Sequence, residues 1–107
     1  MILATVHEVP GYRVKEVLGL AKGNTIRAQH LGEDIVAFFK NMVGGEISEY
    51  TKMVAEARDQ ALDRMVEDAK AQGADAVIGV KFTNSLMQGA AELLAYGTAV
   101  KLERVGD

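Results

Sequence analysis

The stretch AQGADAVIGV (residues 71–80) decides the fold, because helical periodicity ends in it and strand periodicity begins. Upstream of it, apolar residues recur every three or four positions, which places them on one stripe of an α-helix. The stripe consists of Tyr50, Met53, Val54, Ala57, Ala61, Leu62, Met65, Val66 and Ala69. Ser48 is a suitable N-cap, and Gly73 suits the left-handed conformation that ends a helix. We therefore expect one long helix that begins at Ser48 and ends just before Gly73.

Downstream of this helix, two segments alternate with a period of two, which predicts strands over residues 76–83 and 93–102. In the second segment, bulky residues share one face and small residues lie opposite them. The bulky face carries Leu94, Tyr96, Thr98, Val100 and Leu102, and the other face carries Leu93, Ala95, Gly97, Ala99 and Lys101. Gly79 and Gly97 predict that another element packs closely against these strands. The polar segment 84–89 joins the two strands into an antiparallel hairpin.

The region before residue 25 is predicted to contain two strands. Residues 2–6 are apolar, and Pro10-Gly11 predicts a turn after them. Residues 12–21 predict a longer strand with a β-bulge at Lys15-Glu16, where the alternation breaks. The triplet Lys22-Gly23-Asn24 has the composition of a turn, so we expect this strand to end there.

A short helix is expected next. Residues 25–31 are compatible with an extended segment, and Gly32-Glu33-Asp34 predicts a helix start with two carboxylates in its first turn. Its apolar stripe consists of Ile35, Val36, Phe38, Phe39, Met42 and Val43, and Gly44-Gly45 ends it. The expected order is therefore β-β-α-α-β-β. Two consecutive helices on one face of an antiparallel sheet give a two-layer α+β fold.

Length and composition limit the class of protein. The 107 residues are expected to form a single domain, residues 1–107. The formal net charge of −3 provides no basic surface, so we expect no nucleic-acid partner. There is no cysteine, which excludes disulfides and thiolate metal ligands. No apolar run reaches membrane-spanning length and the N-terminus has no cationic signal region, so a cytoplasmic location is expected.

Both faces of the predicted strands carry apolar or small residues, as in sheets that are covered on both sides. Two helices can cover only one of these faces. Each Leu- or Val-sized side chain left in water forfeits about 1.5–3 kcal/mol. We therefore expect a second copy of the chain to cover the other face, which makes the protein a homo-oligomer.

Seven segments of the chain resemble the YbjQ-like family, small prokaryotic proteins of unassigned function, some of which are described as heavy-metal-binding. The segments are Gly32-Glu33-Asp34-Ile35, Asn41-Met42-Val43-Gly44-Gly45, Tyr50, Glu56-Ala57-Arg58, Arg64-Met65, residues 73–80 and Tyr96-Gly97-Thr98-Ala99-Val100. They extend over nearly the whole chain. The resemblance implies a dodecin-like subunit that assembles into a pentameric ring, with short strands joining the subunits. It brings no catalytic residues.

Metal binding is one hypothesis for a site. Soft metals need thiolate, imidazole or thioether ligands, and the candidates for imidazole are His7, in a turn, and His30, before the short helix. His30 and Asp34 have the spacing of a helical ligand pair, although Gly32 lies between them. The competing interpretation is a surface histidine beside a capping carboxylate. An oligomer could also bring copies of His7 or His30 together around an axis. The methionines Met42, Met53 and Met65 are assigned to the core by their helical spacing.

A polar group forms the second candidate site. Arg27, His30, Glu33 and Asp34 lie close in sequence and could line a ligand pocket. Glu33 and Asp34 point about 100° apart on a helix, so stabilisation of the helix dipole explains them better than acid–base catalysis. Residues 44–48 could cradle an anion at the start of the long helix but lack the ending of a P-loop, and the alternative is a plain interhelix turn.

These features favour a non-enzymatic, ring-forming module that binds a small ligand or ion at subunit boundaries. The alternative is a structural assembly or adaptor ring with a protein or membrane-associated partner. An enzyme ranks third, because no nucleophile, base and orienting group can be named together. No cofactor is predicted, and a metal ion is the one candidate left open.

Overall fold

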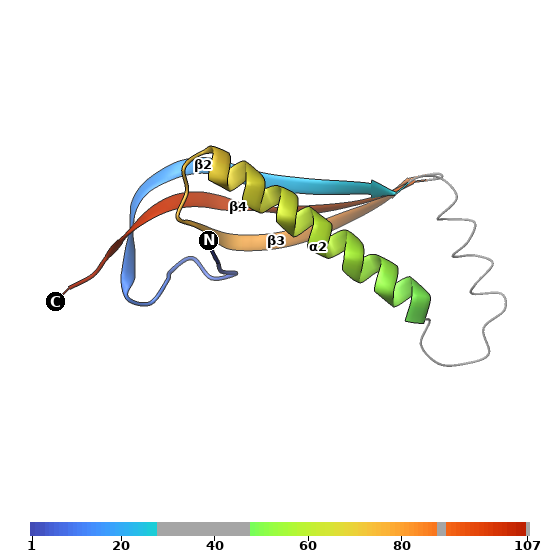
Figure 1. Cartoon of the computed structure of the whole chain (residues 1–107), viewed down its shortest axis with the longest axis horizontal. Coiled ribbons are helices and arrows are strands. Elements are labelled where there is room, and N and C mark those ends of the chain that lie inside the picture. The colour runs from blue at the N-terminus through green and yellow to red at the C-terminus, as the bar shows by residue number, and fades with distance from the viewer. Residues whose placement is uncertain (28–47, 88–89, 107) are drawn as a thin grey trace.

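The computed structural model describes residues 1–27, 48–87 and 90–106. They form four strands and one helix: β1 (Ile2–Leu3), β2 (Tyr12–Arg27), α2 (Ser48–Ala71), β3 (Ala76–Met87) and β4 (Ala90–Arg104). The strands make one sheet in the order β1-β3-β4-β2, and α2 lies diagonally across one face of it (Figure 1). The fold is α+β, as expected. The predicted short helix of residues 32–45 lies outside the described residues.

The sheet is mixed rather than antiparallel throughout, which corrects the prediction. β1 runs parallel to β3, with Ile2 opposite Ala76, whereas β2 and β3 both run antiparallel to β4. A parallel pair requires a long crossover, and the chain between β1 and β3 supplies one because it contains β2 and α2. Pairing continues past β1, since the amide of Ala4 donates to the carbonyl of Val77 at 3.0 Å.

The long helix has the predicted bounds. It begins at Ser48, and Gly73 follows its end with a φ of +82°. The amide of Ala74 donates to the carbonyl of Ala69 at 3.1 Å, and that of Gly73 to the carbonyl of Lys70 at 2.9 Å. These two bonds form a Schellman motif, which satisfies the last carbonyls of the helix and turns the chain toward β3.

The predicted turn at Lys22-Gly23-Asn24 is wrong, because β2 continues through it to Arg27. Gly23 is buried under α2, and a Cβ on it would lie 2.2 Å from the backbone nitrogen of Met65. The glycine therefore serves a close approach between strand and helix rather than a turn. Composition alone does not separate these two uses of glycine.

Irregularities in the ladders decide which side chains face the helix. The predicted bulge in β2 is confirmed, since the register shifts between Val14 and Glu16, and a second shift follows before Gly19. A third shift, in β3 after Ile78, was not predicted. It comes at Gly79, whose φ is +62°, and it brings Val80 into the cluster under the helix.

The predicted hairpin of β3 and β4 is confirmed, but its strands are longer than expected. Ordered pairing extends to Met87 opposite Ala90, so most of the polar segment 84–89 belongs to β3. Polar residues can occupy this end of the strand because Lys81 to Ser85 are exposed. Solvent rather than a packed layer surrounds them, so the sequence pattern there is not constrained by burial.

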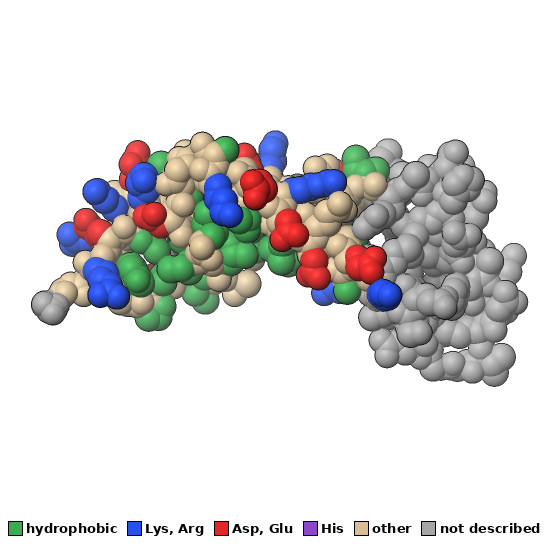
Figure 2. Space-filling model, in the orientation of Figure 1, with side chains coloured by type: hydrophobic (Ala, Val, Ile, Leu, Met, Phe, Trp, Pro, Cys, Tyr) green, Lys and Arg blue, Asp and Glu red, His purple; other side chains and the backbone are tan. Residues whose placement is uncertain are grey.

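The core lies between α2 and the face of the sheet that carries small residues. It consists of Ala21, Ala61, Met65, Ala69, Val77, Val80, Ala95 and Ala99. Met65 is fully buried there, which confirms its predicted role in packing. Gly97 is also buried on this face, where a Cβ would lie 2.6 Å from a methyl group of Val77. Figure 2 shows charged side chains spread along the outside of the helix.

Candidate functional site

Within residues 1–27, 48–87 and 90–106, the face of the sheet opposite α2 is covered only at one end. The segment of residues 4–11 crosses from the β3 edge to the start of β2, and Val9 packs on a second buried cluster. That cluster contains Ala76, Ile78 and Val100, with Leu102 at its margin. The sequence predicted that nothing within the chain would cover this face, so the N-terminal segment partly corrects that expectation.

Beyond this cover, β2 presents a row of bare apolar side chains. Val17, Leu20 and Ile26 are 64%, 58% and 66% exposed. Their partners across the ladder are Val100, Thr98 and Glu92, so the row lies on the face opposite the helix. We call Val17, Leu20 and Ile26 the β2 row. Three large aliphatic side chains on one strand, more than half exposed, are typical of a surface that another molecule covers.

The outer edge of β2 beside this row is occupied by side chains of α2. The Arg64 guanidinium donates to the carbonyl of Asn24 at 2.6 Å, and the Gln72 amide donates to the carbonyl of Leu20 at 2.9 Å. Between them, the backbone amide of Lys22 donates to the carboxylate of Asp68 at 2.9 Å. The three helix residues are spaced four apart, so one from each turn meets every second residue of the strand.

We call Arg64, Asp68 and Gln72 the edge-capping residues. Arg64 and Asp68 have the spacing of an ion pair on one helix face, but both instead bind the backbone of β2. Side chains that occupy the backbone groups of an edge strand prevent another strand from pairing there. Contact with a second molecule at this part of β2 must therefore be made by the side chains of the β2 row.

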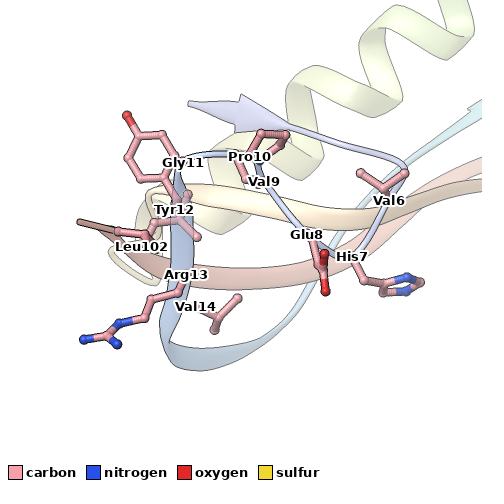
Figure 3. A pocket seen from close by; sticks show the side chains of 11 residues that line it. Val6, His7, Glu8, Val9, Pro10, Gly11, Tyr12, Arg13, Val14 and Leu102 are labelled. Atoms are coloured by element: carbon pink, nitrogen blue, oxygen red, sulfur yellow. The ribbon is translucent and has the colours of Figure 1, made fainter. Parts of the chain in front are cut away.

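A cleft of about 780 Å³ opens between the N-terminal segment and the start of β2. Its lining is mostly apolar and includes Val105. Figure 3 labels four further apolar residues of the lining, Val6, Val9, Val14 and Leu102. Val6, Val14 and Val105 remain exposed. The cleft adjoins the bare surface of the sheet, because Val14 lies near the end of β2 from which the β2 row continues.

Besides Tyr12, with its hydroxyl group, three polar side chains line this cleft. Arg13 is paired with Glu103 across the ladder from β2 to β4. His7 lies against Gly79, where its Nε2 is 2.8 Å from the position of an added Cβ. Glu8 makes no ion pair and no side-chain hydrogen bond within residues 1–27, 48–87 and 90–106. Figure 3 shows the Glu8 carboxylate on the side of the loop that faces Val14, with His7 and Arg13 directed away.

The predicted site residues are only partly described. His7 is an exposed residue of the N-terminal segment, and Arg27 is the last residue of β2, opposite Ala91. His30, Glu33 and Asp34 lie outside the described residues, so the predicted polar group stays a prediction. No pattern in the sequence indicated the cleft or the edge-capping residues, since both depend on segments that are far apart in the chain.

The part of the chain that the structure describes does not assemble a metal site. It contains no group of three or more histidine, cysteine, aspartate or glutamate side chains that could hold an ion. At the cleft, His7 and Glu8 are neighbours in sequence, but Figure 3 shows their side chains pointing in different directions.

Among the residues that the structure describes, no helix is long and apolar enough to cross a membrane.

The described residues, a four-strand mixed sheet with one helix across it, define a small α+β protein. A family model described as "Putative heavy-metal-binding" matches residues 1–103, and the chain belongs to this YbjQ-like family. A UPF0145 protein of Thermotoga petrophila is 58% identical over 106 residues, covering 98% of this chain and 100% of its own length. Relatives in Thermus thermophilus and Methanosarcina acetivorans are 55% and 54% identical, covering 96% and 95% of this chain and 91% and 97% of their own.

A solved structure shares the fold. It is a protein of unknown function from Pediococcus pentosaceus, with a TM-score of 0.62 and 20% sequence identity. The match covers 96% of this chain and 98% of that one. At this level of identity the similarity shows the fold alone, and the names of the relatives assign no activity.

Proposed function

We propose that the protein is a non-enzymatic, homo-oligomeric binding module that forms a ring and holds a small ligand at or near the boundaries between its subunits. Five subunits are expected from the family resemblance, and the cytoplasm is the expected location. The observation that carries the proposal is the β2 row, because three aliphatic side chains more than half exposed have no cover within the described chain.

A second apolar surface lies at the opposite edge of the sheet. Met1, Ile2 and Leu3 are 45%, 37% and 41% exposed at β1, and we call them the β1 patch. β1 and β2 are the two outermost strands of the sheet. When two different surfaces on opposite sides of a subunit meet each other, the contact is head-to-tail, and it closes into a ring if the rotation between neighbours allows.

Burial of these surfaces would contribute to holding copies together. Covering one Leu- or Val-sized side chain contributes about 1.5–3 kcal/mol. The β2 row and the β1 patch together offer six large apolar side chains for each contact. Part of this gain offsets the loss of translational and rotational freedom on association.

The binding role is supported by the cleft, which is concave, mostly apolar and next to the bare face. The alternative is a scaffold or adaptor ring without a small ligand. The β2 row favours that alternative if it remains uncovered in the assembly, because it would then offer an apolar surface to a different protein.

Native mass spectrometry of protein purified without chelator tests the assembly. We expect a single oligomer for the wild type and for Gln60→Lys, which adds one positive charge on the exposed side of α2. We expect Leu20→Lys, which adds the same charge within the β2 row, to be monomeric and folded by circular dichroism. A wild-type monomer at micromolar concentration, or an unchanged oligomer in Leu20→Lys, would contradict the proposal.

The same spectra test the binding role. A stoichiometric non-protein mass, present on purification or after titration with metal ions, would support a binding module and identify the class of ligand. An oligomer that carries no such mass and takes up no metal above nonspecific levels favours the scaffold. If the wild type carries such a mass, the spectrum of Leu20→Lys shows whether binding requires contact between subunits. Loss of the mass in this variant would mean that it does.

A further inference from the structure

We infer that the cleft beneath the N-terminal segment binds a small organic amine, with the ammonium group on the Glu8 carboxylate and the alkyl part against the apolar walls. This assigns a site and a ligand class to the binding module proposed above, and rests on that proposal in treating the protein as a binder. The site uses residues of one subunit only. It can therefore be tested separately from the assembly.

The walls of the cleft determine the apolar part of the ligand. Val6 comes from the N-terminal segment, Val14 from the start of β2, and Leu102 and Val105 from the end of β4. A volume of about 780 Å³ lies within the range of about 300–1,000 Å³ that is usual for small-molecule sites. Because the exposed valines lose contact with water when an alkyl chain lies on them, the walls favour an aliphatic body over a fully polar one.

The charges around the cleft determine the polar part. The guanidinium of Arg13 is neutralised by Glu103, so it offers little attraction to an anion. The Glu8 carboxylate has no such partner among the described residues, and it faces the space above Val14 (Figure 3). Glu8 is therefore the carboxylate of the cleft lining that has no ion-pair partner among the described residues. A formal net charge of −3 for the whole chain also favours a cation over an anion.

An amine satisfies this arrangement better than a bare metal ion. One carboxylate provides too few oxygens for Ca²⁺, which takes six to eight, and Mg²⁺ retains its own water when it has so few protein ligands. An ammonium group needs only one carboxylate for a charge-assisted hydrogen bond, and water can satisfy its other donors at the open mouth. Its alkyl chain then contacts the walls, which a hydrated ion does not.

Three probes with the same alkyl chain and different head groups test the inference: hexylamine, hexan-1-ol and hexanoate. Each is titrated into the full-length protein at neutral pH while backbone amide signals are followed by NMR. We expect saturable shifts at residues 6–14 and 102–105, with hexylamine binding about fourfold more tightly than hexanol, as one exposed ion pair allows. Hexanoate is expected to bind most weakly.

Charge reversal at Glu8 provides the decisive variant, because this exposed loop residue is not needed for packing. In Glu8→Lys we expect hexanoate to bind more tightly than hexylamine, while hexanol is unchanged. Glu67→Lys makes the same change on the exposed side of α2 and should keep the wild-type order. The inference is overturned if Glu8→Lys keeps the wild-type order, if the shifts lie elsewhere, or if no probe gives saturable shifts.

Native mass spectrometry of the same samples separates this result from the proposed function. A monomer that shows the expected order of affinities would contradict the proposed ring of subunits and support the amine site. An oligomer without the order would overturn the amine site and leave the ring supported. If a neighbouring subunit fills the cleft, Leu20→Lys will bind hexylamine and the wild type will not, which also overturns the inference for the assembled protein.

Discussion

The two faces of the sheet differ in the size of their side chains, and this difference indicates what covers each of them. The face under α2 carries Gly23, Ala95, Gly97 and Ala99, so the helix backbone approaches the strands closely. The opposite face carries the β2 row and the bulky residues of β4, and among the described residues the N-terminal segment covers it where Val9 packs. Small residues therefore mark a contact made within the subunit, and large exposed residues mark a contact left for another molecule.

The largest effect is expected at the closest contact of the helix face. In Gly23→Ala, the new Cβ would lie 2.2 Å from the nitrogen of Met65, and backbone atoms of α2 cannot move away independently. We expect a loss of about 3 kcal/mol or more in the free energy of unfolding, measured by urea denaturation.

The control for this contact is Gly11→Ala. Gly11 has a φ of +84° and no atom within 4 Å of an added Cβ, so only backbone strain of about 1–2 kcal/mol is expected. Equal losses in the two variants would mean that α2 does not lie on Gly23.

Met65→Ala and Leu20→Ala compare the two faces directly. Met65 is fully buried, so its truncation should cost about 3 kcal/mol at every protein concentration. Leu20 is 58% exposed, so its truncation should matter only through association, and its effect should grow with protein concentration. Denaturation at two concentrations a hundredfold apart distinguishes the two. A loss in Leu20→Ala that is independent of concentration would place Leu20 in the core of the subunit.

Gly79→Ala tests the segment that covers one end of the second face. The residue has a φ of +62°, and the His7 ring lies over it. We expect a loss of about 1–2 kcal/mol, mainly from backbone strain, because the end of the His7 side chain can move. A double-mutant cycle with His7→Ala should give a coupling energy of about 0.5 kcal/mol. A coupling energy as large as the loss in Gly79→Ala would show instead that the His7 imidazole ring cannot move away from residue 79.

The smallest effect is expected at the edge-capping residues. Asp68→Ala removes the acceptor of the Lys22 amide at the edge of β2, at a cost of about 1 kcal/mol. Hydrogen exchange of that amide should accelerate about fivefold, the equivalent of this loss. Asp63→Ala, an exposed position on the same helix, should leave the exchange rate of Lys22 unchanged.

Local patterns predicted the helix, the hairpin and the bulge at Lys15, because each depends on residues close together in the sequence. They failed at Gly23, because the role of this glycine depends on a distant element, α2. At Gly79 they predicted a close contact, which the His7 side chain makes, but not the shift in register at this position. The parallel pairing of β1 has the same cause, since nothing in residues 2–3 indicates where β3 will lie.

The candidate site was less predictable than the fold. Of the predicted site residues that the structure describes, His7 lies at the cleft and Arg27 at the far end of β2. The cleft itself is built from residues 6–14 together with Leu102 and Val105, which are about ninety positions apart in the chain. Spacing within one segment carries no information about such a site. The apolar face that α2 does not cover was predictable in contrast. The prediction needed only the two apolar faces of the strands and the observation that two helices cover one face.

The edge-capping residues have a consequence for the behaviour of the protein at high concentration. Amyloid growth requires strands to be added repeatedly, with each new strand leaving an open ladder for the next. Over residues 20–24, Arg64, Asp68 and Gln72 already occupy backbone groups of β2, so this stretch provides no template. The helix that builds the core thus also prevents fibril growth from this part of the sheet, while the side chains of the β2 row beside it remain exposed.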